Sequence, residues 1–148
     1  MVRRRPTCGT PDAVVRLRPA CGAPDAVACR RPIPEASCVG ETEAALVEKK
    51  IPYVVGRARY ADLPRGDIIG DTGGFLKLLF HREDLRLLGV HVMGEQATEV
   101  VHVGLVAMMT NSGADLFNRT CFNYPTLGDL YKNAAYDAIL QLNKLGSK

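Results

Sequence analysis

The sequence has no tryptophan, no apolar run near the length of a membrane span, and no pair of cysteines at CxxC spacing. A helix that crosses a bilayer needs roughly 20 consecutive apolar residues, so a membrane protein is not expected. The five cysteines are an odd number and indicate neither a zinc knuckle nor a closed disulfide framework. A reducing compartment, the cytoplasm, is the simplest interpretation.

The net charge of +3 is unevenly distributed along the 148 residues. Residues 1–31 hold seven arginines against Asp12 and Asp25, whereas residues 32–148 hold 12 basic against 14 acidic residues. The basic character therefore belongs to the first part of the chain. The rest has no basic stripe of the kind that binds nucleic acid, so we expect no nucleic-acid partner.

The first part of the chain is a tandem repeat with a period of 13 residues, "RPTCGTPDAVVR" from Arg5 and "RPACGAPDAVACR" from Arg18. Each copy has too little apolar surface for a core, and two copies are fewer than the roughly three that a stacked repeat needs. A transit peptide is an alternative, although prolines interrupt the amphipathic helix of such peptides. We expect three parts: a disordered extension over residues 1–32, one domain over 33–145 and a tail over 146–148.

Helix and strand patterns follow in the main part of the chain. Residues 41–50 have acidic groups early and lysines late, as the helix dipole favours, and Pro52 prevents this helix from continuing. Residues 53–60 then begin an extended segment. Residues 73–81 and 87–94 are β-rich runs around a charged turn, which predicts a hairpin. The glycines of "GDTGG" precede a strand and fit no phosphate-loop spacing, so a turn is favoured over a phosphate site.

Two helices are predicted towards the C-terminus. Residues 95–113 are apolar nearly all round, which predicts either a buried central helix or a subunit interface, and Gly113 is expected to end the helix. Thr126 and Asp129 have the shape of a capping box that starts a final helix over residues 127–145. One stripe of this helix is expected to face the core: Leu127, Leu130, Ala134, Ile139 and Leu142. This order of elements predicts an α+β fold with helices packed on an antiparallel sheet.

No metal site is expected. Three histidines fall on different predicted elements, at spacings of ten and eleven residues: His81, His91 and His102. Packed or edge histidines are therefore favoured over metal ligands. Three cysteines of the repeat region would need Cys38 as a fourth zinc ligand, at wide spacings: Cys8, Cys21 and Cys29.

Several motifs occur in the order of a known family: "IPYVVGRARY", "FLKLLFHRE", "LLGVHVMGEQATEVVHVG" and "TCFNYPTLGDLY". Together they resemble the C-terminal dimerisation domain of the FAD-dependent pyridine nucleotide-disulfide oxidoreductases, over residues 33 to about 145. Within that family the residues are most similar to the soluble, Si-specific NAD(P)+ transhydrogenases. The resemblance implies a homodimer in which other domains bind FAD and NAD(P), while this domain forms the interface and reaches towards the partner's flavin.

The resemblance also implies a site before the last helix. In the disulfide-reducing branch this segment reads His-Pro-Thr-x-x-Glu, with histidine as the acid/base and glutamate orienting it; here Tyr124, Pro125, Thr126 and Asp129 stand at those places. A phenol, whose ordinary pKa is about 10, does not exchange protons at neutral pH as an imidazole does. The tyrosine thus favours hydride transfer over dithiol chemistry, and we expect no catalytic residue in this chain. Tyr124, Pro125 and Thr126 are expected near the partner's flavin, or Tyr124 simply packs across the interface.

Other parts of the family pattern are missing from the sequence. It contains no GxGxxG unit for FAD or NAD and no CxxxxC redox pair. We therefore expect a fragment of a transhydrogenase that binds no cofactor and does not turn over alone. The alternatives are a non-enzymatic dimerisation module and part of a dihydrolipoamide dehydrogenase-like reductase. The expected partner is a second copy or a full-length homologue, bound through the apolar helices.

Overall fold

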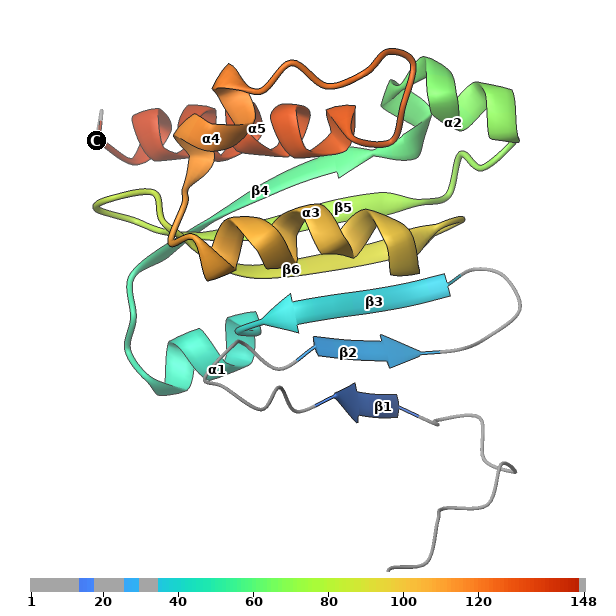
Figure 1. Cartoon of the computed structure of the whole chain (residues 1–148). Coiled ribbons are helices and arrows are strands. Elements are labelled where there is room, and N and C mark those ends of the chain that lie inside the picture. Colours follow the sequence, from blue (N-terminus) through green and yellow to red (C-terminus); the bar gives the residue numbers. More distant parts are fainter. Residues whose placement is uncertain (1–13, 18–25, 30–34, 147–148) are drawn as a thin grey trace, which may run out of the picture.

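A computed structural model describes residues 14–17, 26–29 and 35–146 and shows helices packed on one antiparallel sheet (Figure 1). The sheet has six strands in the order β1-β2-β3-β6-β5-β4, and every neighbouring pair is antiparallel. The strands are β1 Val14–Leu17, β2 Ala26–Cys29, β3 Glu35–Gly40, β4 Tyr53–Arg59, β5 Phe75–His81 and β6 Leu87–Gly94. The α+β fold predicted from the order of the elements is thus confirmed.

The predicted β5–β6 hairpin is confirmed, although β5 begins at Phe75, two residues after the start of the predicted run. Alternate residues of β5 are buried on one face, Leu76, Leu78 and Phe80, because successive side chains of a strand point to opposite faces. Lys77 lies between Leu76 and Leu78 and therefore points to the other face, where His91 of β6 is its partner in the strand register. The sheet therefore has one apolar face and one partly polar face, and helices cover them differently.

The two long helices, α3 Ala97–Met109 and α5 Asp129–Gly146, pack on the apolar face. α5 crosses β4 and β5, while α3 crosses β6 and β3 (Figure 1). The predicted core stripe of α5 is confirmed, since Leu127, Leu130 and Ala134 are buried and Ile139 and Leu142 pack against the same cluster. The short helices are α1 Glu43–Glu48, α2 Pro64–Ile69 and α4 Ala114–Arg119, with a 3-10 turn at Tyr60–Asp62.

The end of α3 differs from the sequence prediction. Gly113 does not end this helix, which stops at Met109; Asn111 takes the left-handed conformation with φ 50°. Asparagine tolerates this conformation because its short polar side chain bonds locally. Gly113 instead precedes α4, with its amide group beside Leu85 and Arg86 of the β5–β6 turn.

The repeat region contains two of the six strands. β1 belongs to the first copy and β2 to the second, and β2 pairs with β3. The expectation of disorder therefore does not hold for residues 14–17 and 26–29, because their backbone groups find partners on a neighbouring strand that sequence periodicity does not reveal. The rest of the extension and the tail at 147–148 lie outside the described residues, and the division at residue 32 stays a prediction.

The "GDTGG" loop is a turn closed by a carboxylate, as predicted. Asp71 accepts hydrogen bonds from the backbone N–H groups of Gly73 and Gly74, both at 3.0 Å, and of Glu95 at 2.7 Å. The amides that a phosphate loop would offer to a ligand are thus bound by the chain's own aspartate. This contact also joins the loop before β5 to the end of β6, where α3 starts.

Candidate functional site

The segment between α4 and α5 presents an exposed aromatic residue on a fixed loop. Tyr124 is 70% exposed, and its peptide bond to Pro125 is cis. On either side of it the chain is held by the core, because Phe122 packs against the hydrophobic cluster and Leu127 is buried. Gly128 permits this arrangement, since a Cβ atom there would lie 2.8 Å from the Phe122 ring.

Thr126 holds the loop in a way that the sequence did not predict. Its hydroxyl donates to the carbonyl oxygen of Asn123 at 2.6 Å and accepts from the N–H of Gly128 at 3.2 Å. The predicted capping box, in which Thr126 would accept from the N–H of Asp129, is therefore wrong. The hydroxyl closes a local turn instead, a common competitor of helix capping for threonine. α5 begins at Asp129, whose carboxylate lies in the first turn and suits the helix dipole.

Tyr131 connects this loop to the middle of α3. Its buried hydroxyl accepts a hydrogen bond from Gly104 N–H at 3.0 Å and donates one to the Val100 carbonyl at 2.8 Å. In an undisturbed α-helix these two backbone groups would bond to each other. Burial raises the pKa of the Tyr131 phenol, so the hydroxyl stays protonated and keeps its donor. The first turn of α5 is thus fixed to α3.

α3 has one buried side and one exposed apolar side. Its buried residues face the sheet: Ala97, Val101, Gly104 and Ala107. Val103, Val106 and Met109 recur every three residues on the solvent side and are exposed. We call these three residues the apolar face of α3. Of the two interpretations that the sequence left open, a helix buried on all sides is excluded in this chain, and a subunit interface is favoured.

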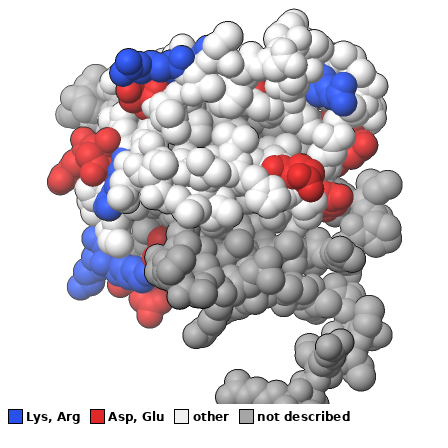
Figure 2. All heavy atoms as spheres, viewed as in Figure 1, with Lys and Arg blue, Asp and Glu red and all other residues white. Residues whose placement is uncertain are grey.

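The surroundings of this face are poor in charge. Figure 2, seen from the side on which α3 lies, shows a surface that is largely uncharged in its middle, with acidic and basic residues near its margins. Further exposed apolar side chains lie on the neighbouring helices: Leu116 on α4 and Tyr136, Leu140 and Leu145 on α5. Exposed apolar side chains on a surface poor in charge are typical of a protein interface.

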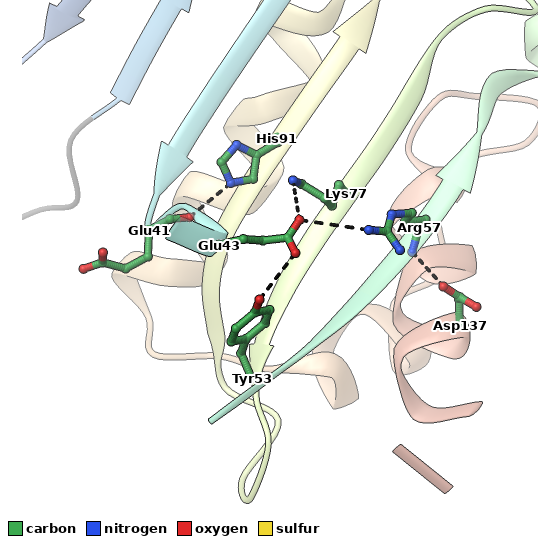
Figure 3. A network of polar contacts seen from close by, with 7 residues as sticks. All are labelled: Glu41, Glu43, Tyr53, Arg57, Lys77, His91 and Asp137. Atoms are coloured by element: carbon green, nitrogen blue, oxygen red, sulfur yellow. Dashed lines mark hydrogen bonds and ion pairs between the residues drawn. The ribbon is translucent and has the colours of Figure 1, made fainter. Parts of the chain in front are cut away.

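The partly polar face of the sheet carries a second group of residues (Figure 3). Glu43, at the start of α1, bonds Lys77 at 2.8 Å and receives the Tyr53 hydroxyl at 3.5 Å, with Arg57 at 4.0 Å. The hydrogen bond from Lys77 holds the pKa of Glu43 below its usual value. These contacts join α1 to β4 and β5, so we assign them to the attachment of α1.

His91 stands beside this group and is half-buried. Its Nε2 lies 3.1 Å from the carbonyl oxygen of Glu41 (Figure 3). Burial lowers the pKa of His91, and the nearby Lys77 ammonium acts in the same direction. His91 also borders a cavity of about 270 Å³ on this face, together with Cys38, Phe75 and Met93.

The three histidines lie on different elements, His81 on β5, His91 on β6 and His102 on α3. His81 lies 3.2 Å from Asp84, and His102 is an exposed residue 3.9 Å from Glu99. Among residues 14–17, 26–29 and 35–146, no three His, Cys, Asp or Glu side chains are placed to hold a metal ion. In the same ranges no helix is long and apolar enough to cross a membrane. Cys8 and Cys21 lie outside the described residues.

Comparison with known proteins relates this chain to flavoproteins. The family described as "Pyridine nucleotide-disulphide oxidoreductase, dimerisation domain" matches residues 31–135. A soluble pyridine nucleotide transhydrogenase of Hahella chejuensis is 51% identical over 111 residues, which are 72% of this chain and 24% of the relative. A protein of the same description from Mycobacterium bovis (strain BCG / Pasteur 1173P2) is 50% identical over 113 residues, 76% of this chain and 24% of the relative.

Solved structures share the fold at lower identity. LpdA from Mycobacterium tuberculosis superposes with a TM-score of 0.66 at 20% identity, covering 70% of this chain and 22% of that chain. The flavoprotein disulfide reductase RclA from Escherichia coli gives a TM-score of 0.65 at 21% identity, covering 72% of this chain and 26% of that chain. The present chain thus spans about a quarter of the length of the relatives that it matches.

Proposed function

This chain belongs to the dimerisation domains of the pyridine nucleotide-disulphide oxidoreductases, and from that premise we propose that it is the subunit-association part of a transhydrogenase. The complete enzyme would move hydride between NADPH and NAD+ through FAD, in the cytoplasm. The chain would serve as one side of a dimer, with a second copy or a full-length homologue as its partner. The apolar face of α3 is the observation that carries this proposal.

The chemistry of the α3 face suits a twofold interface. Val106 is 60% exposed and Met109 is 61% exposed. Covering such side chains contributes roughly 25 cal/mol per Å² of apolar area removed from water. In a twofold dimer the same residues come from both subunits, so the free energy gained by covering each residue contributes twice. The exposed apolar residues of α4 and α5 would extend the contact.

The loop at Tyr124 would complete the partner's flavin site. FAD would supply the chemistry of hydride acceptance, and residues of this chain would line one side of the flavin site. The residues present fit that role, because the Tyr124 ring is 70% exposed while Thr126 and Leu127 fix its backbone. Tyr124 offers a flat face and one O–H donor, and Pro125 offers an apolar edge. Neither moves a proton at neutral pH, so their part is to orient the flavin and exclude water.

The tyrosine also separates this proposal from its alternatives. A dihydrolipoamide dehydrogenase-like reductase needs an acid/base for its dithiol, and a phenol is poorly suited to that task near pH 7. A non-enzymatic dimerisation module would use the α3 face and make no use of the Tyr124 loop. A substitution of Tyr124 should therefore lower hydride transfer if the chain is part of a transhydrogenase, and should have no effect on a non-enzymatic dimerisation module.

A chimera tests the proposal. Residues 33–145 replace the matching region of the Hahella chejuensis transhydrogenase, and hydride transfer from NADPH to a NAD+ analogue is measured. We expect a flavin-loaded dimer that retains transfer within about tenfold of the parent, and we expect Tyr124→Ala to lower transfer at least tenfold without loss of FAD. Val47→Ala, at an exposed residue of α1 outside the proposed contact, is the control. A dimer with normal FAD content whose transfer is unaffected by Tyr124→Ala would contradict the role of the loop.

A further inference from the structure

The two strands of the repeat region pair in a symmetric register. The observed partners are Val14 with Cys29, Val15 with Ala28, Arg16 with Val27 and Leu17 with Ala26. Because the repeat has a period of 13 residues, Ala28 is the second-copy equivalent of Val15. Val15 therefore lies opposite its own equivalent. The pairs on either side are exchanged symmetrically, since Val14 faces the equivalent of Arg16, and Arg16 faces the equivalent of Val14.

This register means that one copy of the repeat pairs with another copy of itself about a local twofold axis. The axis passes through the pair formed by Val15 and Ala28. Antiparallel pairing of two equivalent strands has this symmetry only when equivalent residues meet at its centre. The repeat unit is thus complementary to itself at the level of the backbone. The two copies within one chain are similar but not identical in sequence. The same segment of another chain is identical, so two such segments can pair about an exact twofold axis.

Among the described residues, β1 has one edge on which such a segment could pair. It is the outermost strand of the described sheet, with β2 on one side and no strand of the described residues on the other (Figure 1). An uncovered edge strand offers a row of N–H and C=O groups to another strand. Along the sequence, Pro11 and Pro19 flank β1, and proline cannot donate to a ladder. Any pairing at this edge is therefore confined to a short stretch around Val15.

We propose that β1 pairs with β1 of a second copy of this chain, antiparallel, with Val15 of the two chains directly opposite each other. The contact uses the same edge on both chains, so it closes into a pair and does not grow into a fibre. Arg16 would stand opposite Val14 of the second chain, so the register places no two arginines directly opposite each other. The strands β1 and β2 of both chains would then lie side by side in one sheet, which overcomes the shortage of copies in a single chain.

This contact is separate from the one at α3, which lies on a face of the sheet rather than at its edge. Each contact can therefore be removed alone. The test uses the full chain with Val106→Glu, which introduces a charge into the α3 face and leaves only the sheet edge for association.

Cysteine scanning tests the register. The five natural cysteines are changed to serine, and single cysteines are placed at positions 14, 15 and 16 in turn. Directly opposite residues of an antiparallel pair have Cβ atoms about 4.5–5.5 Å apart, whereas those displaced along the ladder are about 7–8 Å apart. On mild oxidation V15C is expected to give covalent dimers at least fivefold faster than V14C or R16C. Equal rates at all three positions, or no dimer from V15C, would overturn the proposal.

A measurement of mass gives a second, independent answer. In the Val106→Glu chain, Val15→Pro removes a backbone donor from the strand and is expected to halve the mass seen by light scattering at high concentration. Val2→Pro lies well before the strand and is the control, with the mass expected to stay unchanged. Circular dichroism shows whether each variant is folded. A folded Val15→Pro chain with the same mass as its control would contradict the pairing.

Discussion

Replacing Tyr131 by phenylalanine is expected to lower the free energy of unfolding by about 2 kcal/mol. The hydroxyl makes two hydrogen bonds, at 3.0 Å from Gly104 N–H and at 2.8 Å to the Val100 carbonyl, and its residue is fully buried. A net hydrogen bond contributes about 1 kcal/mol, and a buried group left without a partner costs about 1–3 kcal/mol. Loss of these two hydrogen bonds, at about 1 kcal/mol each, gives the expected loss of about 2 kcal/mol.

Thermal unfolding measures this loss against a matched control. A change of about 2 kcal/mol corresponds to a fall in Tm of about 6–8 °C for a chain of this size. Tyr136→Phe makes the same substitution five residues further along α5, at a residue that is 49% exposed, and should change Tm by less than about 2 °C. Amide exchange at Gly104 should be faster in Tyr131→Phe. Equal Tm values for the two variants would refute the account of α3 given above.

Two further substitutions probe the packing of α3 and the pH dependence of the sheet. Gly104→Ala should cost about 1–2 kcal/mol by chemical denaturation, because the new Cβ would lie 2.5 Å from Val90 Cγ2; Gly73→Ala, with nothing nearer than 3.8 Å, should cost less than about 0.5 kcal/mol. His91 has a lowered pKa, so the folded state binds its proton less readily than the unfolded chain, and stability should fall as pH drops below 6.5. His91→Gln should flatten the slope of Tm against pH from 7.5 to 5, whereas His102→Gln should keep it; parallel slopes in all three proteins would contradict the assignment.

Local patterns in the sequence predicted most of the long elements. The hairpin of β5 and β6 was predicted within two residues because alternation, β-branched residues and a charged turn all agree there. α1 and α5 were predicted within two or three residues. α2 and α4 were missed, since six residues give too short a period to recognise.

Contacts between distant residues could not be predicted. The partners of β1 and β2 depend on pairing across the sheet, for which four apolar or mixed residues give no signal. Tyr131 looked like part of an ordinary helix, and its bonds to Gly104 and Val100 join residues 27 and 31 positions apart. The only sequence clue was a tyrosine among apolar residues, which when buried needs a partner for its hydroxyl.

The candidate site was predicted mainly from motifs shared with a known family, and only partly from the physical chemistry of its residues. The sequence singled out Tyr124, Pro125 and Thr126, and the structure presents Tyr124 on an exposed loop. The capping role assigned to Thr126 was wrong, because threonine can close a turn as readily as it caps a helix. An apolar helix predicted either burial or an interface, and only the packed structure distinguishes them, since burial depends on what lies beside the helix.

Sedimentation of the chain with and without a charge on α3 tests the central claim most directly. The chain used for this test carries Val15→Pro, which removes the contribution of the sheet edge. We predict that it sediments as a dimer when the protein concentration is about 10 times the dissociation constant of the α3 dimer. Val106→Glu should weaken that dimer about 100-fold and give a monomer, because a carboxylate loses its hydration in a closed apolar interface. Val47→Glu, at an equally exposed valine of α1, should leave the dimer intact. A monomer throughout, or a dimer that Val106→Glu does not disturb, would contradict the assignment of α3 as the association surface.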